Sequence, residues 1–150
     1  MSDLFEAYER YLKTEKKASE NTVSSYLRDV TQFSEYLAEH QGCDLRQADG
    51  EMIQDYMSWM RGRGKSAASV TRFLASVKSF YNFLLSAGAV KANPAKSISA
   101  DRAERKYPEI LTSKEVELFL EQPRCVDAKG YRDHAMLELL YATGIRVSEL

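Results

Sequence analysis

The sequence has little of what several classes of protein require. It holds only 2 cysteines, Cys43 and Cys125, and 2 histidines, His40 and His134, with no CxxC pair and no metal-ligand spacing. Neither a disulfide framework nor a metal site is therefore expected, and the cysteines are interpreted as free thiols in the cytoplasm. Apolar runs are only a few residues long and the first residues do not resemble a secretory signal, so we expect no membrane association.

Acidic residues are absent from one long stretch of the chain. Residues 61–100 hold seven basic residues and no acidic one, whereas residues 1–50 hold six basic and ten acidic residues. The basic residues of the stretch are Arg61, Arg63, Lys65, Arg72, Lys78, Lys91 and Lys96. The net charge of −1 argues mildly against nucleic-acid binding, because phosphate binding usually leaves a basic footprint. An ordinary exposed surface mixes both signs, so the segregation favours an anionic partner.

The residues that are present form helical patterns. Hydrophobic content of 44% and charged content of 29% are typical of a globular protein. Apolar residues recur every three or four positions and no strand pattern appears, which predicts an all-α fold. The expected helices run from Asp3 to about Lys16, from a cap at Ser19 to Gly42, from Met52 to Met60, from Ser66 to about Ser86, from a Thr112–Glu115 capping box to Leu120, and from Tyr131 to Ala142.

The helix predicted from Ser66 has two distinct faces on a helical wheel. Its apolar sector contains Val70, Phe73, Leu74, Val77, Tyr81, Leu84 and Leu85. A separate sector contains Lys65, Ser69, Arg72, Ser76 and Ser79. Small side chains let a phosphate backbone come close, and the basic side chains can then reach its oxygens. A plain solvated face is the alternative, and the missing acidic residues favour the phosphate-binding interpretation.

The chain ends in an apolar helix, a glycine turn and an arginine, in the run LELLYATGIRVSEL. The single turn after Arg146 fixes several dihedral angles for one hydrogen bond and cannot stand alone, so we expect a piece of a longer protein. This run, with Arg132 and Asp133 upstream, resembles the first catalytic-arginine motif of the tyrosine recombinase (phage integrase) family, in particular its Xer type. Its specificity comes from an apolar helix, a glycine exit, an arginine and an acidic residue in a short window.

The resemblance implies an architecture and an activity. Residues 1–97 would form a four-helix SAM-like core-binding domain, residues 98–110 a linker, and residues 111–150 the first helices of a tyrosine recombinase catalytic domain. The implied function is site-specific DNA recombination, in which strands are cleaved and rejoined through a phosphotyrosine intermediate without metal, ATP or another cofactor. The implied partners are double-stranded DNA and like or related recombinase subunits, assembled as a tetramer on paired sites.

The resemblance also assigns roles to residues. Arg146 would be catalytic, because a guanidinium can bind two phosphate oxygens at once, and Glu149 would support it. A helix-terminal salt bridge and an ordinary first-turn acid are the plain interpretations of these two residues. The implied DNA-binding residues are Lys17, Thr22, Tyr26, Arg28, Arg61, Arg63, Lys65, Ser69, Arg72 and Lys78. For Tyr26 core packing is an equal alternative, and for the glycine-flanked loop around Arg63 a solvated turn is the alternative.

The family's remaining catalytic groups have no counterpart here. A hairpin lysine, a His-x-x-Arg cluster and the nucleophilic tyrosine would lie beyond Leu150, and none of the 9 tyrosines matches the nucleophile's motif. The 150-residue chain is therefore predicted to be inactive alone. Two other functions stay open from the sequence: a non-catalytic helical DNA-binding regulator, and a helical module whose basic face meets an acidic protein.

Overall fold

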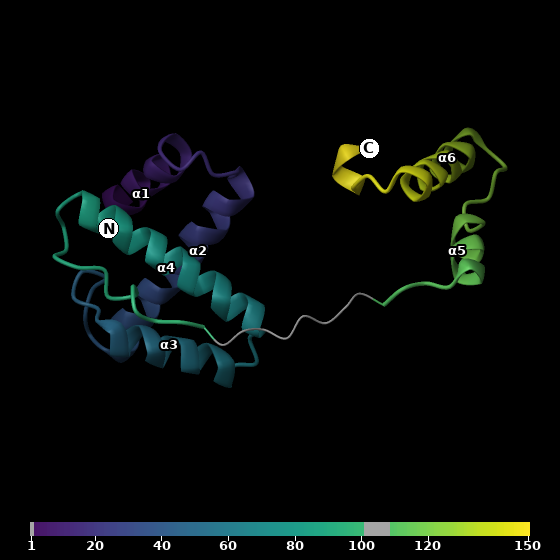
Figure 1. Ribbon diagram of the computed structural model, residues 1–150. Coiled ribbons are helices and arrows are strands. Elements are labelled where there is room, and N and C mark those ends of the chain that lie inside the picture. The colour runs from purple at the N-terminus through teal and green to yellow at the C-terminus, as the bar shows by residue number, and fades with distance from the viewer. Residues whose placement is uncertain (1, 101–108) are drawn as a thin grey trace. The chain divides into compact units, whose positions relative to one another are not determined.

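The computed structural model describes residues 2–100 and 109–150, which fall in two compact units, Met1–Glu104 and Arg105–Leu150. Within the described ranges every regular element is a helix (Figure 1), so the predicted all-α class is confirmed. Most of the predicted linker, 98–110, falls on residues 101–108, which lie outside the described residues. The linker and the domain limits on either side of it therefore remain predictions.

Four helices build the first unit. They are α1 (Ser2–Thr14), α2 (Glu20–His40), α3 (Gly50–Gly62) and α4 (Ala67–Ser86). Three of these helices are preceded by a capping residue: Ser19, Asp49 or Ser66. The side chain of each capping residue accepts a hydrogen bond from a backbone N–H in the first turn of its helix. Such caps satisfy donors that a helix start leaves without a partner, and they fix where each helix begins. Gly42 follows α2 with a φ of 63°, the left-handed conformation expected from the sequence.

The core lies around α4, which packs against α1, α2 and α3. At its centre the rings of Phe33, Tyr56 and Phe73 meet with centroid separations of 4.7 to 5.5 Å. Because three helices cover α4, its buried face is wider than the predicted stripe and includes Phe80, which is fully buried. The prediction was wrong at Leu85, which is 43% exposed because it lines an open surface hollow beside residues 91–96.

Three buried phenols make the first unit sensitive to alkali. Burial raises the pKa of Tyr56 to about 12 and raises the pKa of Tyr8 and Tyr81 further. Below about pH 10 these phenols are neutral in both states, whereas above it the unfolded chain ionises first and loses its protons more easily than the folded chain. We therefore expect the urea midpoint to hold steady up to about pH 9.5 and to fall between about pH 10 and 12.

Two tyrosine variants control this measurement. Tyr56→Phe removes one buried phenol and should flatten the alkaline fall, whereas Tyr131→Phe, at a residue that is 62% exposed, should leave the curve unchanged. A midpoint that stayed constant up to pH 12 would contradict the assignment.

The second unit contains α5 (Ser113–Leu120), α6 (Ala128–Thr143) and the 3-10 helix η1 (Val147–Glu149). The predicted capping box is confirmed, because the Thr112 N–H donates to Glu115 Oε2 at 2.7 Å while the Glu115 N–H donates to Thr112 Oγ1. The prediction for α6 was wrong at its start, which lies three residues before Tyr131 because Asp127 caps it. Gly130 belongs to this helix, and a glycine is required there because a Cβ would collide with the Arg124 carbonyl.

Apolar side chains of the second unit stay in contact with solvent. Within residues 109–150 no side chain is buried, and α5 and α6 touch through a few contacts such as His134 Nδ1 to the Leu120 carbonyl, 3.1 Å. The exposed apolar residues include Ile110, Leu111, Leu118, Phe119, Tyr131, Leu139 and Tyr141. Two helices of this size expose apolar faces that a larger core would cover.

In the described part of the chain, no helix is long and apolar enough to cross a membrane.

Candidate nucleic-acid interface

A buried carboxylate joins α2 to α4 where the two helices cross. Asp29 of α2 is 3% exposed and accepts from Arg72 Nε at 3.1 Å, from Arg72 Nη2 at 3.0 Å and from Ser76 Oγ at 2.8 Å. A charge taken out of water is costly unless it is paired and hydrogen-bonded, and here both carboxylate oxygens have partners. This contact raises the pKa of the Arg72 guanidinium, chiefly through its hydrogen bonds to Asp29.

The same contact divides the polar sector predicted on α4. Ser76 was expected on an exposed basic face, but it is fully buried and its carbonyl accepts from the Tyr8 hydroxyl at 3.3 Å. That expectation was wrong because α1 and α2 cover this edge of α4, which a helical wheel cannot show. The outer part of the sector remains accessible: the Arg72 side chain is 48% exposed, and Ser69 lies partly exposed one turn earlier.

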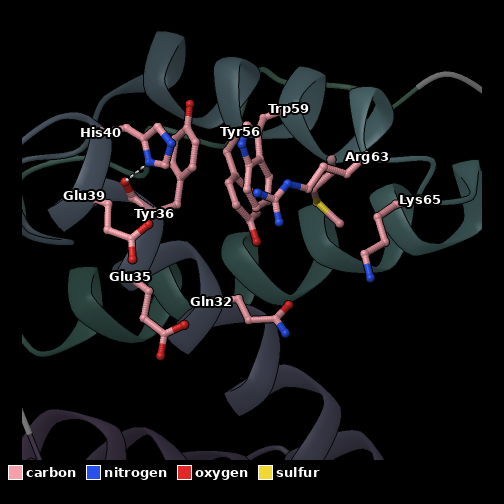
Figure 2. A pocket seen from close by; sticks show the side chains of 10 residues that line it. Gln32, Glu35, Tyr36, Glu39, His40, Tyr56, Trp59, Arg63 and Lys65 are labelled. Carbon is pink, nitrogen blue, oxygen red and sulfur yellow. Dashed lines mark hydrogen bonds between the residues drawn. The ribbon is translucent and has the colours of Figure 1, made fainter.

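The glycine-flanked loop after α3 does not form one basic cluster. The Arg63 guanidinium lies over the Trp59 ring, 4.4 Å from its centroid, and with Lys65 it borders a hollow of about 280 Å³. Figure 2 shows Glu35 and Glu39 of α2 lining the same hollow, across the aromatic rings from these cations. Arg61 lines a different hollow beside residues 97–99. Charges that are segregated along the sequence are therefore mixed in space.

The other predicted contact residues have varied surroundings. Lys78 Nζ donates to the Ile98 carbonyl at 2.6 Å, which anchors the chain after α4. Lys17 is exposed between α1 and α2 and has a φ of 49°, a conformation that residues other than glycine seldom adopt. The Thr22 hydroxyl lies 3.0 Å from Ser19 Oγ, and the ring of Tyr26 packs partly against the core. Arg28 is exposed on α2.

Arg146 lies between the end of α6 and η1. Gly144 ends α6 with a φ of 66°, and Arg146 follows in an extended conformation with its side chain 82% exposed. Glu149 accepts from the Arg146 backbone N–H at 2.8 Å, and its other oxygen lies 3.5 Å from Arg146 Nη1. The carboxylate therefore fixes the backbone turn more tightly than it holds the guanidinium, whose remaining donors face solvent.

Sequence reasoning missed three acidic residues that matter to this surface: Asp29, Glu35 and Glu39. A signal for the first was available, because Asp29 lies between Tyr26 and Phe33 on the apolar side of its helix. A charged residue among core positions predicts a buried partner. No comparable signal marks the two glutamates, whose exposed positions are typical of a solvated helix face.

The first unit is a bundle of the SAM-like class, and a match to a known family makes the assignment specific. Residues 5–88 match the family described as "Phage integrase, N-terminal SAM-like domain", and the chain belongs to this family. Over all 150 residues it is 36% identical to the tyrosine recombinase XerD of Staphylococcus aureus, of which it covers 51%. The chain thus spans about half the length of such curated relatives.

A solved structure has a similar fold. The integrase of transposon Tn1549, determined in complex with a circular intermediate DNA, aligns with a TM-score of 0.65 and 17% sequence identity. The alignment covers 97% of this chain and 46% of the integrase. At this level of identity the likeness concerns the fold alone.

Proposed function

We propose that the full-length protein is a site-specific tyrosine recombinase, and that this chain supplies DNA binding and the first catalytic arginine. The observation that carries the proposal is the 36% identity with XerD along the whole chain, including the segment around Arg146. The proposed substrate is double-stranded DNA, and the proposed partners are like or related subunits assembled as a tetramer on paired sites. The reaction takes place in the cytoplasm and needs no metal or other cofactor, because the phosphotyrosine ester conserves the bond energy.

Arg146 is proposed to bind the phosphate that is attacked. Attack on a phosphodiester builds negative charge on the non-bridging oxygens, and a guanidinium can donate to two of them. The exposure of the Arg146 side chain and its solvent-facing donors support this role. Glu149 is proposed to act as a positioning residue, since its carboxylate bonds the backbone that carries the arginine. The chain alone is proposed to be inactive because it lacks the nucleophile's motif.

The first unit is proposed to bind duplex DNA through the polar sides of α2 and α4 and the loops beside them. The proposed contact residues are Lys17, Thr22, Tyr26, Arg28, Arg61, Arg63, Lys65, Ser69, Arg72 and Lys78. Exposed Lys17, Arg28 and Lys65 are suited to phosphate contacts, since a flexible cation can follow the backbone. Tyr26 and Lys78 also make contacts within the unit, so their share in binding is expected to be smaller.

Binding through phosphates predicts a steep salt dependence. The measurement is a mobility-shift titration of the 150-residue chain on random duplex DNA at several salt concentrations. Each phosphate that the chain neutralises should add about −0.9 to the slope of log affinity against log salt, and the total slope should be steeper than about −2. Arg28→Ala should reduce the slope by about 0.9 if it removes one phosphate contact. Lys129→Ala, an exposed cation on α6 outside the proposed set, is the control and should leave the slope unchanged. The absence of duplex binding would refute the proposal.

A further inference from the structure

We infer that Arg72, held in place by Asp29, reads the edge of a DNA base, with guanine preferred, and is not a phosphate contact. This inference deepens the proposed function and rests on it, since it requires that α4 approaches duplex DNA. It differs from the role suggested by the sequence alone, in which Arg72 was one of several cations aimed at phosphates.

The first support is the geometry of the guanidinium. Asp29 takes up the edge formed by Nε and Nη2, at 3.1 and 3.0 Å. A guanidinium has five N–H donors in a planar fork, so one N–H of Nη2 and both of Nη1 are not used by Asp29, and one from each nitrogen lies on the outer edge. Two of these are parallel, the arrangement that donates to O6 and N7 of guanine. The side chain as a whole is 48% exposed, so a ligand can approach it.

The second support is charge. The Asp29 carboxylate, with 4% of its side chain exposed, lies against the arginine and offsets its positive charge. A neutralised pair attracts a phosphate weakly and releases few counterions, but its hydrogen-bond donors are unaffected. Ser76 also donates to the carboxylate at 2.8 Å, so the carboxylate cannot turn away and the plane of the guanidinium is fixed. Fixed orientation contributes to base discrimination, whereas a phosphate contact needs only a mobile cation.

The third support is the shape of α4 around Arg72. The side chains one turn before it and three residues after it are short: Ala68 and Ala75 are exposed, and Ser69 is partly exposed. Arg72 is therefore the longest side chain on this strip of the N-terminal half of the helix. A helix that enters the major groove contacts base edges from its N-terminal half, and short neighbours let it come close enough.

Selection from a randomised duplex library tests the inference with the 150-residue chain. We expect the wild-type chain to enrich guanine at one position by about 5- to 150-fold over other bases. Arg72→Ala and Arg72→Lys should both abolish this enrichment, since neither alanine nor lysine can make the paired contact. Both variants should change the slope of log affinity against log salt by less than about half of the 0.9 expected for the loss of one phosphate contact. Arg28→Ala is the matched control: it should lower the slope and leave the guanine preference intact.

Asp29→Asn separates base reading from a purely structural role. The amide keeps the shape and one acceptor oxygen but removes the charge that holds and offsets Arg72. We therefore expect two opposite changes: weaker guanine enrichment and a salt slope that becomes steeper by up to about 0.9, because Arg72 regains its charge and mobility. If Asp29 only joined the two helices, a folded Asp29→Asn variant would show neither change. Circular dichroism establishes that the variant is folded.

Several outcomes would overturn the inference. The first is guanine enrichment that survives in Arg72→Lys. The second is an Arg72→Ala variant that keeps its base preference while its salt slope falls in magnitude by about 0.9. The third is a wild-type chain that binds duplex DNA without preferring any base. Arg72→Lys keeps a cation beside Asp29, so the test does not depend on Arg72→Ala being folded. Absence of any duplex binding by the wild-type chain would instead refute the proposed function.

Discussion

Phe33→Ala should lower the free energy of unfolding of the first unit by about 3 to 5 kcal/mol, a large fraction of what a domain of this size has. Phe33 is fully buried, and its ring lies 5.2 Å from that of Tyr56 and 5.5 Å from that of Phe73. Truncation removes apolar contact and leaves a cavity between α2, α3 and α4, which cannot all move inward at once. Urea unfolding followed by circular dichroism measures the loss.

The matched control is the same substitution at an exposed position. Phe119 of α5 is 54% exposed, and Phe119→Ala should change the unfolding of the first unit by less than about 0.5 kcal/mol. Equal effects of the two substitutions would mean that Phe33 is not part of a close-packed core. A loss below about 1 kcal/mol at Phe33 would contradict the packing described.

Arg146→Ala should reduce the rate of strand cleavage by the proposed full-length recombinase about 10²- to 10³-fold. The guanidinium is expected to bind the phosphate oxygens as charge develops on them, and the methyl group of alanine offers no donor. Single-turnover formation of the covalent protein–DNA adduct on a nicked substrate measures this step. Affinity for the same DNA should change far less than the rate, because the contact strengthens in the transition state.

Two controls accompany the Arg146 measurement. Arg124→Ala removes an exposed arginine that precedes α6 and should leave the cleavage rate within about twofold of wild type, the range of a neutral surface change. The 150-residue chain alone should form no adduct, since the proposed nucleophile lies outside it. An adduct formed by that chain, or full cleavage by Arg146→Ala, would contradict the assigned chemistry.

Local signals decided most of the fold. Ser19, Ser66 and the Thr112–Glu115 pair lie next to the helices they cap, so their hydrogen bonds could be predicted from residues three positions apart. The start of α6 was missed because the residues before Tyr131, from Arg124 to Gly130, are rich in turn formers. The need for glycine at position 130 depends on the Arg124 carbonyl, which the folded loop places beside it.

The surface proposed to bind DNA was less predictable because its charges meet across long sequence separations. Asp29 and Arg72 belong to different helices, and Glu35 shares a hollow with Arg63. Counting charges along the chain treats neighbours in sequence as neighbours in space, which fails where two helices cross. The geometry at Arg146 followed the sequence better, since Glu149 is only three residues away and Gly144 sets the turn.

The pairing of Asp29 with Arg72 constrains how the protein can evolve. Replacing Arg72 first would leave the buried Asp29 carboxylate without its cationic partner, which is strongly destabilising. Replacing Asp29 first leaves a half-exposed arginine that water can solvate. Descendants that adopt an uncharged residue at position 72 should therefore have passed through a neutral residue at position 29. The order of the two substitutions is set by solvation, and homologous lineages should inherit the two positions as a linked pair.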